Sequence, residues 1–103
     1  MTLTDIKNML VEVDPTIKHY FTMGNGEAYT YWEETKRLAL MADNEHEEGW
    51  RFYVHRFAKA ENDAIATSLF NALDADDRVS VTWTVDYESD TGYIHHIFEC
   101  EGW

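Results

Sequence analysis

The sequence predicts an α+β fold in which one mostly antiparallel sheet of about five to six strands packs with two helices. Two stretches, residues 3–13 and 61–73, have apolar side chains at helical spacing. Residues 79–87 alternate apolar and polar side chains, which is the pattern of a strand with one buried face. At 103 residues and 45% hydrophobic content, the chain is expected to form a single domain spanning 1–103.

The N-terminal part is expected to form a helix followed by a hairpin. The helix over 3–13 should end before Pro15, because proline disfavours helical geometry in the residue that precedes it. Alternation over 17–23 predicts a strand, and the Gly-Asn-Gly turn after it tolerates positive φ. The chain should then enter a second strand at 28–32.

The middle of the chain is expected to contain two more strands separated by a loop. A weak alternation over 36–41 predicts the third strand. Residues 43–49 are polar throughout and predict an exposed loop. Residues 50–57 carry aromatic side chains at both odd and even positions, which is typical of a central strand with both faces covered.

The C-terminal part is expected to form a helix and a hairpin. Asn62 or Asp63 is placed to cap the helix over 61–73. The strand over 79–87 should be joined by a polar turn to an antiparallel strand over 93–100.

The composition predicts a protein that avoids nucleic acids and membranes. Twenty Asp and Glu residues against eight Lys and Arg give a formal net charge of -12, which disfavours direct contact with phosphates or anionic lipid. No apolar run approaches a membrane span, and the first residues lack the features of a signal peptide. Cys100 is the only cysteine, so no internal disulfide is expected, and the composition is typical of a cytoplasmic protein.

The chemically reactive residues form no motif that indicates catalysis or metal binding. His95 and His96 are neighbours on a predicted strand and should point to opposite faces. The serines lie in no glycine-flanked turn, and carboxylate pairs are expected by chance in so acidic a chain. We therefore expect a protein that is not an enzyme, with no catalytic, cofactor-binding or metal-binding residues.

Residues 85–98 carry the most distinctive stretch, Val-Asp-Tyr-Glu-Ser-Asp-Thr-Gly-Tyr-Ile-His-His-Ile-Phe. This stretch resembles the tail terminator proteins of long-tailed bacteriophages and prophages, which are also called tail completion or head-to-tail joining proteins. The order of elements is also similar to that family: a short helix ending near a proline, aromatic-rich strands, a helix like 63–73 and a final hairpin.

The resemblance implies a non-enzymatic virion protein that caps the assembled tail tube, stops its growth and presents a surface to the head-completion proteins. It also implies a homo-oligomer, a hexameric ring in many members, found in the virion and in the host bacterial cytoplasm during assembly. Acidic walls would suit a ring through which DNA passes, because they repel phosphates.

Three segments are the candidate protein contacts. The predicted loop contributes Asp43, Glu45, Glu47 and Glu48, the final hairpin turn contributes Glu88, Asp90 and Thr91, and the last residue is Trp103. A tryptophan at this position is either docked on its own domain or offered to a partner.

Two other functional classes stay open at the level of sequence. One is a small acidic protein-binding inhibitor or DNA mimic, which predicts one contiguous acidic face. The other is a small enzyme with a pocket formed by His55, His95 and Tyr53, which predicts perturbed ionisation at a concave site.

Overall fold

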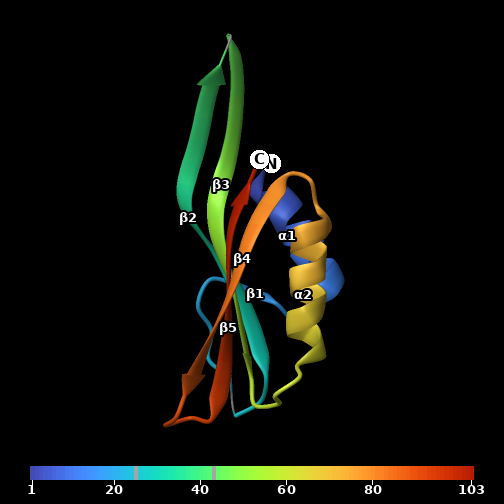
Figure 1. The fold of residues 1–103 in the computed structure, drawn as a ribbon, viewed down its shortest axis with the longest axis vertical. Coiled ribbons are helices and arrows are strands. Elements are labelled where there is room, and N and C mark those ends of the chain that lie inside the picture. The colour runs from blue at the N-terminus through green and yellow to red at the C-terminus, as the bar shows by residue number, and fades with distance from the viewer. Residues whose placement is uncertain (25, 43) are drawn as a thin grey trace.

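A computed structural model describes residues 1–24, 26–42 and 44–103 of the chain. Within these residues, two helices lie on one face of a sheet of five strands, so the predicted α+β class is confirmed (Figure 1). The elements are α1 (Leu3–Val13), β1 (Lys18–His19), β2 (Tyr29–Ala42), β3 (Glu45–Ala58), α2 (Ala64–Ala75), β4 (Val79–Glu88) and β5 (Tyr93–Gly102). The molecule is elongated, with principal extents of 51 × 24 × 22 Å. Neither helix is long and apolar enough to span a membrane.

The strand order across the sheet is β1-β2-β3-β5-β4. The short β1 pairs parallel to β2, whereas the other three pairings are antiparallel. β3 therefore lies at the centre, as its aromatic side chains at odd and even positions predicted. β4 forms one outer edge of the sheet.

Both helices begin at a side-chain cap. Thr2 and Asp5 form a reciprocal capping box at α1, in which each side chain accepts a hydrogen bond from the other residue's backbone N–H. Asp63 caps α2 by accepting from the Ala66 N–H at 2.9 Å, so the cap is Asp63 and not Asn62. The second helix is shifted from the predicted 61–73 to 64–75 by this cap.

The core fills the space between the helices and the sheet. Its large members are fully buried, and burying each contributes about 1.5–3 kcal/mol. The cluster comprises Ile6, Leu10, Trp32, Phe52, Val54, Ala66, Leu69, Leu73, Phe98 and Cys100. It is formed by inward residues of β2, β3 and β5 and by one stripe of each helix.

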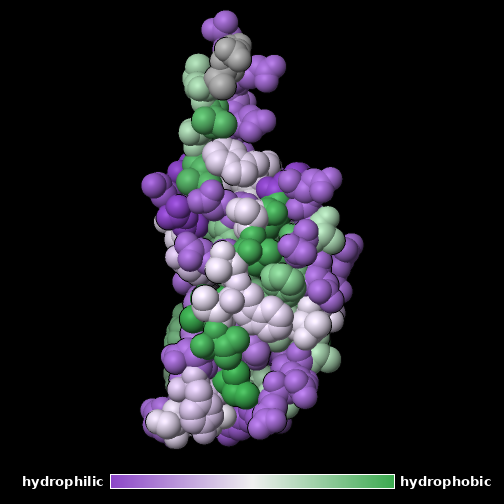
Figure 2. Space-filling view, in the orientation of Figure 1, coloured by the Kyte–Doolittle hydropathy of each residue, from purple (hydrophilic) through white to green (hydrophobic). Residues whose placement is uncertain are grey.

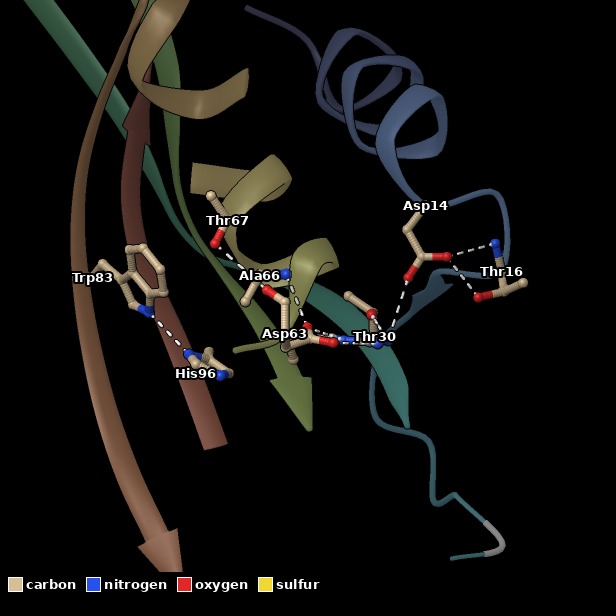
Figure 3. A network of polar contacts seen from close by, with 9 residues as sticks. Asp14, Thr16, Thr30, Asp63, Ala66, Thr67, Trp83 and His96 are labelled. Carbon is tan, nitrogen blue, oxygen red and sulfur yellow. Dashed lines mark hydrogen bonds and ion pairs between the residues drawn. The ribbon is translucent and has the colours of Figure 1, made fainter. Parts of the chain in front are cut away.

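A buried polar network ties both helices to the sheet (Figure 3). The Arg56 side chain on β3 is 9% exposed and binds Asp63 in a bidentate manner, at 2.8 and 3.1 Å. It also donates to Thr30 at 3.1 Å and lies 3.9 Å from Asp14, which follows α1. Burial alone would raise the pKa of Asp63, but hydrogen bonds from Arg56 and the Ala66 N–H hold it below its usual value.

The predicted hairpin between 17–23 and 28–32 is wrong. Only Lys18–His19 forms a strand, and it runs parallel to β2. Tyr20 has φ 72° and its N–H donates to the Trp32 carbonyl at 2.7 Å, so the chain turns away at that point. His19 stacks on Trp32 with ring centroids 3.9 Å apart. This tertiary contact outweighs the local alternation that predicted a longer strand.

The strand predicted at 28–32 and the strand predicted at 36–41 are one continuous strand, β2. A bulge at Thr35 shifts the register between Glu34 and Lys36. The predicted loop over 43–49 is also wrong, because residues 45–49 begin β3 and pair with 38–42. Both faces of this ribbon are open to solvent, so the polarity that indicated a loop is compatible with a strand.

Candidate interaction surface

A two-stranded arm projects from the sheet beyond the helices (Figure 1). We define the arm as residues 35–42 of β2 and 45–50 of β3. The pairing of β5 with β3 ends at Gly102 and Trp50, so in the described part of the chain residues 45–49 pair only with β2. An isolated two-stranded ribbon is only marginally stable in water. Contact with another chain would stabilise the arm, so we regard it as a candidate contact element.

The arm combines exposed apolar side chains with charges (Figure 2). Leu40 is 51% exposed and Met41 is 71% exposed. Arg37 forms an ion pair with Glu48, and its guanidinium lies 4.9 Å above the centre of the Trp50 ring. Both charged side chains are half exposed, so the pair orients the arm without adding much stability.

The predicted contacts Glu45, Glu47 and Glu48 lie on the arm, in β3. Asp43, the fourth contact predicted for this segment, lies outside the described residues. The three described carboxylates are exposed, as expected, but they project from a paired strand and not from a loop.

Trp103 is docked on its own domain at the base of the arm. The backbone N–H of Trp103 donates to the Arg78 carbonyl at 2.8 Å, and the Trp103 carbonyl accepts from the Met1 amine. Its partly exposed side chain borders an open cavity of about 600 Å³, which is lined by Met1, Glu47, Glu48, Asp77, Arg78 and Trp103. The structure thus brings Glu47, Glu48 and Trp103 together, although Glu48 and Trp103 are 55 positions apart in the sequence.

Gly49 occupies the point where the arm leaves the sheet. A Cβ on this residue would overlap the Gly102 carbonyl oxygen and lie 3.1 Å from the Trp103 ring. Because a backbone atom is in the way, β3 and β5 would have to separate. We expect Gly49→Ala to lower the free energy of unfolding by about 1–3 kcal/mol in urea titrations, as overpacking does.

The matched control for this substitution is Ser80→Ala, an exposed position on β4, for which we expect a change within about 0.5 kcal/mol. Hydrogen exchange should rise at Gly102 and Trp103 in Gly49→Ala and not in Ser80→Ala. Equal stability of the two variants would contradict the close approach of β3 and β5.

The contacts predicted in the final hairpin lie at the other end of the long axis (Figure 1). The turn is closed by the Gly92 N–H, which donates to the Glu88 carbonyl at 2.8 Å, and Gly92 has φ 77°. The Thr91 hydroxyl accepts from the Tyr93 N–H at 3.2 Å, while Asp90 is exposed. The candidate contacts therefore form two separate groups, one at the arm and one at the β4–β5 turn. In the second group, Glu88 and Thr91 also form hydrogen bonds that hold the turn itself.

β4 carries a second exposed apolar group. Val85 is 58% exposed and Tyr87 is 64% exposed, on the face of the sheet where the helices lie. In the described part of the chain no strand pairs with the outer side of β4. The strand also contains no Lys, Arg or Pro, the residues that commonly block sheet edges.

The sheet face opposite the helices, called here the open face, has its own aromatic cluster. Tyr29 stacks on Phe57 at 4.6 Å, and Phe57 stacks on His95 at 4.0 Å. Phe21 meets Tyr31 edge-on at 5.6 Å. Tyr31, Phe57 and Tyr93 are buried although both described helices lie on the other face, because part of the segment between β1 and β2 crosses this face. Side chains of β3 are therefore covered on both faces of the sheet, as the aromatic residues at odd and even positions of 50–57 predict.

A chain of polar side chains crosses the open face beside this cluster. His55 Nδ1 and His95 Nε2 are 2.9 Å apart, His55 Nε2 is 3.3 Å from Glu33, and His95 Nδ1 is 3.8 Å from Glu88. Burial and the neighbouring His55 lower the pKa of His95 to about 4. Burial also lowers the pKa of His55, despite the opposing effect of Glu33. Both rings are therefore neutral at neutral pH.

This arrangement brings together His55 and His95, two of the residues considered for a small enzyme. The third, Tyr53, lies nearby, with its ring centroid 6.1 Å from that of His55. Two neutral imidazoles flanked by carboxylates can take up a proton. Among the described residues, no group of three or more His, Cys, Asp or Glu side chains is placed to hold one metal ion. His96 points to the opposite face from His95, as predicted, and accepts from the Trp83 indole at 3.1 Å (Figure 3).

Comparison with known proteins adds no relative: the chain matches no protein-family model and no curated protein sequence.

Proposed function

We propose that this protein is a structural assembly protein that caps the tail tube of a long-tailed phage or prophage and joins the tail to the head. The observation that carries this proposal is the sheet itself, which has a projecting arm and a β4 edge with which no other described strand pairs. Free strand edges and exposed apolar ribbons are surfaces for pairing with other chains. The stretch that resembles tail terminators, residues 85–98, covers the turn of the β4–β5 hairpin and the adjoining parts of both strands.

The two ends of the molecule suit a protein that joins two different partners. The arm forms one end and the β4–β5 turn forms the other (Figure 1). Leu40 and Met41 offer apolar area at the first end, and Asp90 offers a carboxylate at the second. A cap needs one surface for the tube and another for the head-completion proteins, and these two ends supply different chemistry for each.

The charges of the open face support a ring through which DNA passes. Residues paired directly across strands point to the same face. By this criterion the open face carries carboxylates from β2, β4 and β5, namely Glu33, Asp86, Glu88, Glu99 and Glu101. Lining a ring with this face would repel the phosphates of passing DNA. We expect no DNA binding at low salt, and firm binding there would contradict the acidic lumen.

The same carboxylates favour a second candidate, a small acidic inhibitor or DNA mimic. A mimic presents a row of negative charges to a basic nuclease or repressor. The two candidates differ in what they recognise: the cap binds only where a tail tube ends, whereas the mimic binds a basic protein and ignores tubes.

The deciding experiment mixes the protein with tail tubes assembled from the major tail protein of the same phage or prophage. We expect electron microscopy to show density at tube ends alone, and light scattering to show that tubes stop growing. An unrelated acidic protein of similar size is the control. A protein that ignores tubes at every concentration would refute the cap and favour the mimic.

A further inference from the structure

We propose that copies of this chain join when the arm of one copy adds to the β4 edge of the next copy. The arm edge is defined here as the outer backbone edge of residues 35–42. This inference rests on the proposed assembly function for its purpose, but its evidence is the fit between the two edges.

Both edges have backbone groups available for pairing. β4 is ten residues long and is the last strand of the sheet. On the other side of the sheet, β1 covers β2 only at Tyr31 and Trp32. In the described residues the arm edge has no pairing strand, so the arm is available to a partner strand, whereas β1 occupies the edge of β2 at Tyr31 and Trp32. Strand addition of this kind gains main-chain hydrogen bonds along its length.

The side chains of the two edges match face by face. On the open face, Leu40 of the arm would lie opposite Thr84 of β4. In the same register Ala39 meets Val85 on the helix side, and Arg37 lies against Tyr87; these four helix-side residues are all exposed. When two sheets join with their faces aligned, their edge strands present equivalent sides, so on the helix side apolar Ala39 meets apolar Val85 and the Arg37 guanidinium can lie over the Tyr87 ring. The exposure of Val85 and Tyr87 then has an explanation, since a second copy covers them.

The charges of the two edges are complementary. The β2 half of the arm contains Lys36 and Arg37 and no acid, whereas β4 contains Asp86 and Glu88 and no base. By strand pairing, Lys36, Asp86 and Glu88 all belong to the open face. In a chain with net charge -12, most contacts between copies are repulsive, so opposite charges on two free edges select this contact.

The geometry of the contact is head-to-tail. The two joined edges differ, so the joined pair retains one free arm and one free β4 edge for further neighbours. Contacts of this type generate a closed ring when the rotation closes and a filament when it does not. β2 and β4 run in opposite directions within one copy, so the new pairing is antiparallel when corresponding strands of neighbouring copies point the same way.

Cysteine cross-linking between two populations tests the contact even when association is transient. One population carries Leu38→Cys or Leu40→Cys on the arm, and the other carries Thr82→Cys or Thr84→Cys on β4. These four positions belong to the open face. The native Cys100 is 1% exposed and burial raises its thiol pKa, so it need not be replaced. Thr67→Cys, exposed on α2, is the control.

We expect at least one arm–β4 pair to cross-link on mild oxidation about tenfold faster than either arm variant with Thr67→Cys, as for a specific encounter. The fastest pair reports the register. Rates equal to the control for all four pairs would overturn the inference.

Charge exchange provides the second measurement. Lys36→Glu on the arm or Asp86→Lys on β4 should each slow cross-linking about fivefold, and combining Lys36→Glu in one population with Asp86→Lys in the other should restore the rate. Both residues are exposed, so the fold should persist. No effect of charge would overturn the inference. If cross-linking succeeds while tube ends stay uncapped, the proposed function fails and this contact stands.

Discussion

Arg56→Ala is expected to lower the free energy of unfolding by about 3–5 kcal/mol, because it leaves buried carboxylates without their partner. The Arg56 side chain is 9% exposed, and the side chains of Asp14 and Asp63 are 6% and 11% exposed. Arg56 contacts three elements: it binds Asp63, the cap of α2, it donates to Thr30 of β2, and it lies near Asp14, the residue after α1. Its loss therefore weakens the docking of both helices at once. Urea titration followed by tryptophan fluorescence measures the change.

Arg51→Ala is the matched control, since Arg51 is also an arginine of β3 with a carboxylate partner. It binds Glu101 at 2.8 Å, but both side chains are about one-third exposed. A partly exposed ion pair of this kind contributes less than about 1 kcal/mol. Equal losses for the two arginines would show that burial of the Arg56 network is not what stabilises the junction.

Acidification is expected to remove about 3 kcal/mol of stability through His95 between about pH 7 and about pH 4. The pKa of His95 is about 4 in the folded chain, against 6.5 for an unperturbed histidine. The folded state therefore binds fewer protons than the unfolded state across this window. Stability is fully present above pH 6.5 and is lost as the pH falls toward the folded pKa, at about 1.4 kcal/mol per unit.

The test compares urea unfolding of wild type and His95→Gln across this pH range. Glutamine does not titrate, so the variant should lose clearly less stability than wild type on acidification. Burial lowers the pKa of His55 as well, so His55 should account for part of the pH dependence of stability that remains in His95→Gln. His46→Gln, exposed on the arm, should retain the dependence of wild type. Identical pH profiles for wild type and His95→Gln would refute the neutral, buried state of His95.

The predictions from sequence succeeded where local pattern and tertiary environment agree. The helix over 3–13 forms as predicted because its apolar stripe and its capping box agree. The strand over 79–87 forms because its alternation matches a face that is partly covered at Val79, Val81 and Trp83. The histidines at 95 and 96 separate to opposite faces for the same reason.

The candidate contacts were predicted in part. The acidic residues of the arm are exposed and Glu47 and Glu48 approach Trp103, but the chain forms a strand there. Polarity does not distinguish a loop from a two-stranded ribbon with solvent on both sides. The exposed Val85 and Tyr87 were missed as surface candidates, because alternation places them on the apolar side of β4 without showing where α2 stops covering it.

The amino-acid sequence by itself determined the α+β class, the two helices, the final hairpin and the acidic charge, because the helices and the hairpin depend on neighbours within a few residues and the charge on composition alone. Tertiary structure alone decided the parallel pairing of β1, the fusion of two predicted strands into β2, and the length of the arm. It also assembled the Arg56 network and the His55–His95 pair. These features depend on contacts between distant segments, whose free energies exceed the local preferences that sequence patterns report.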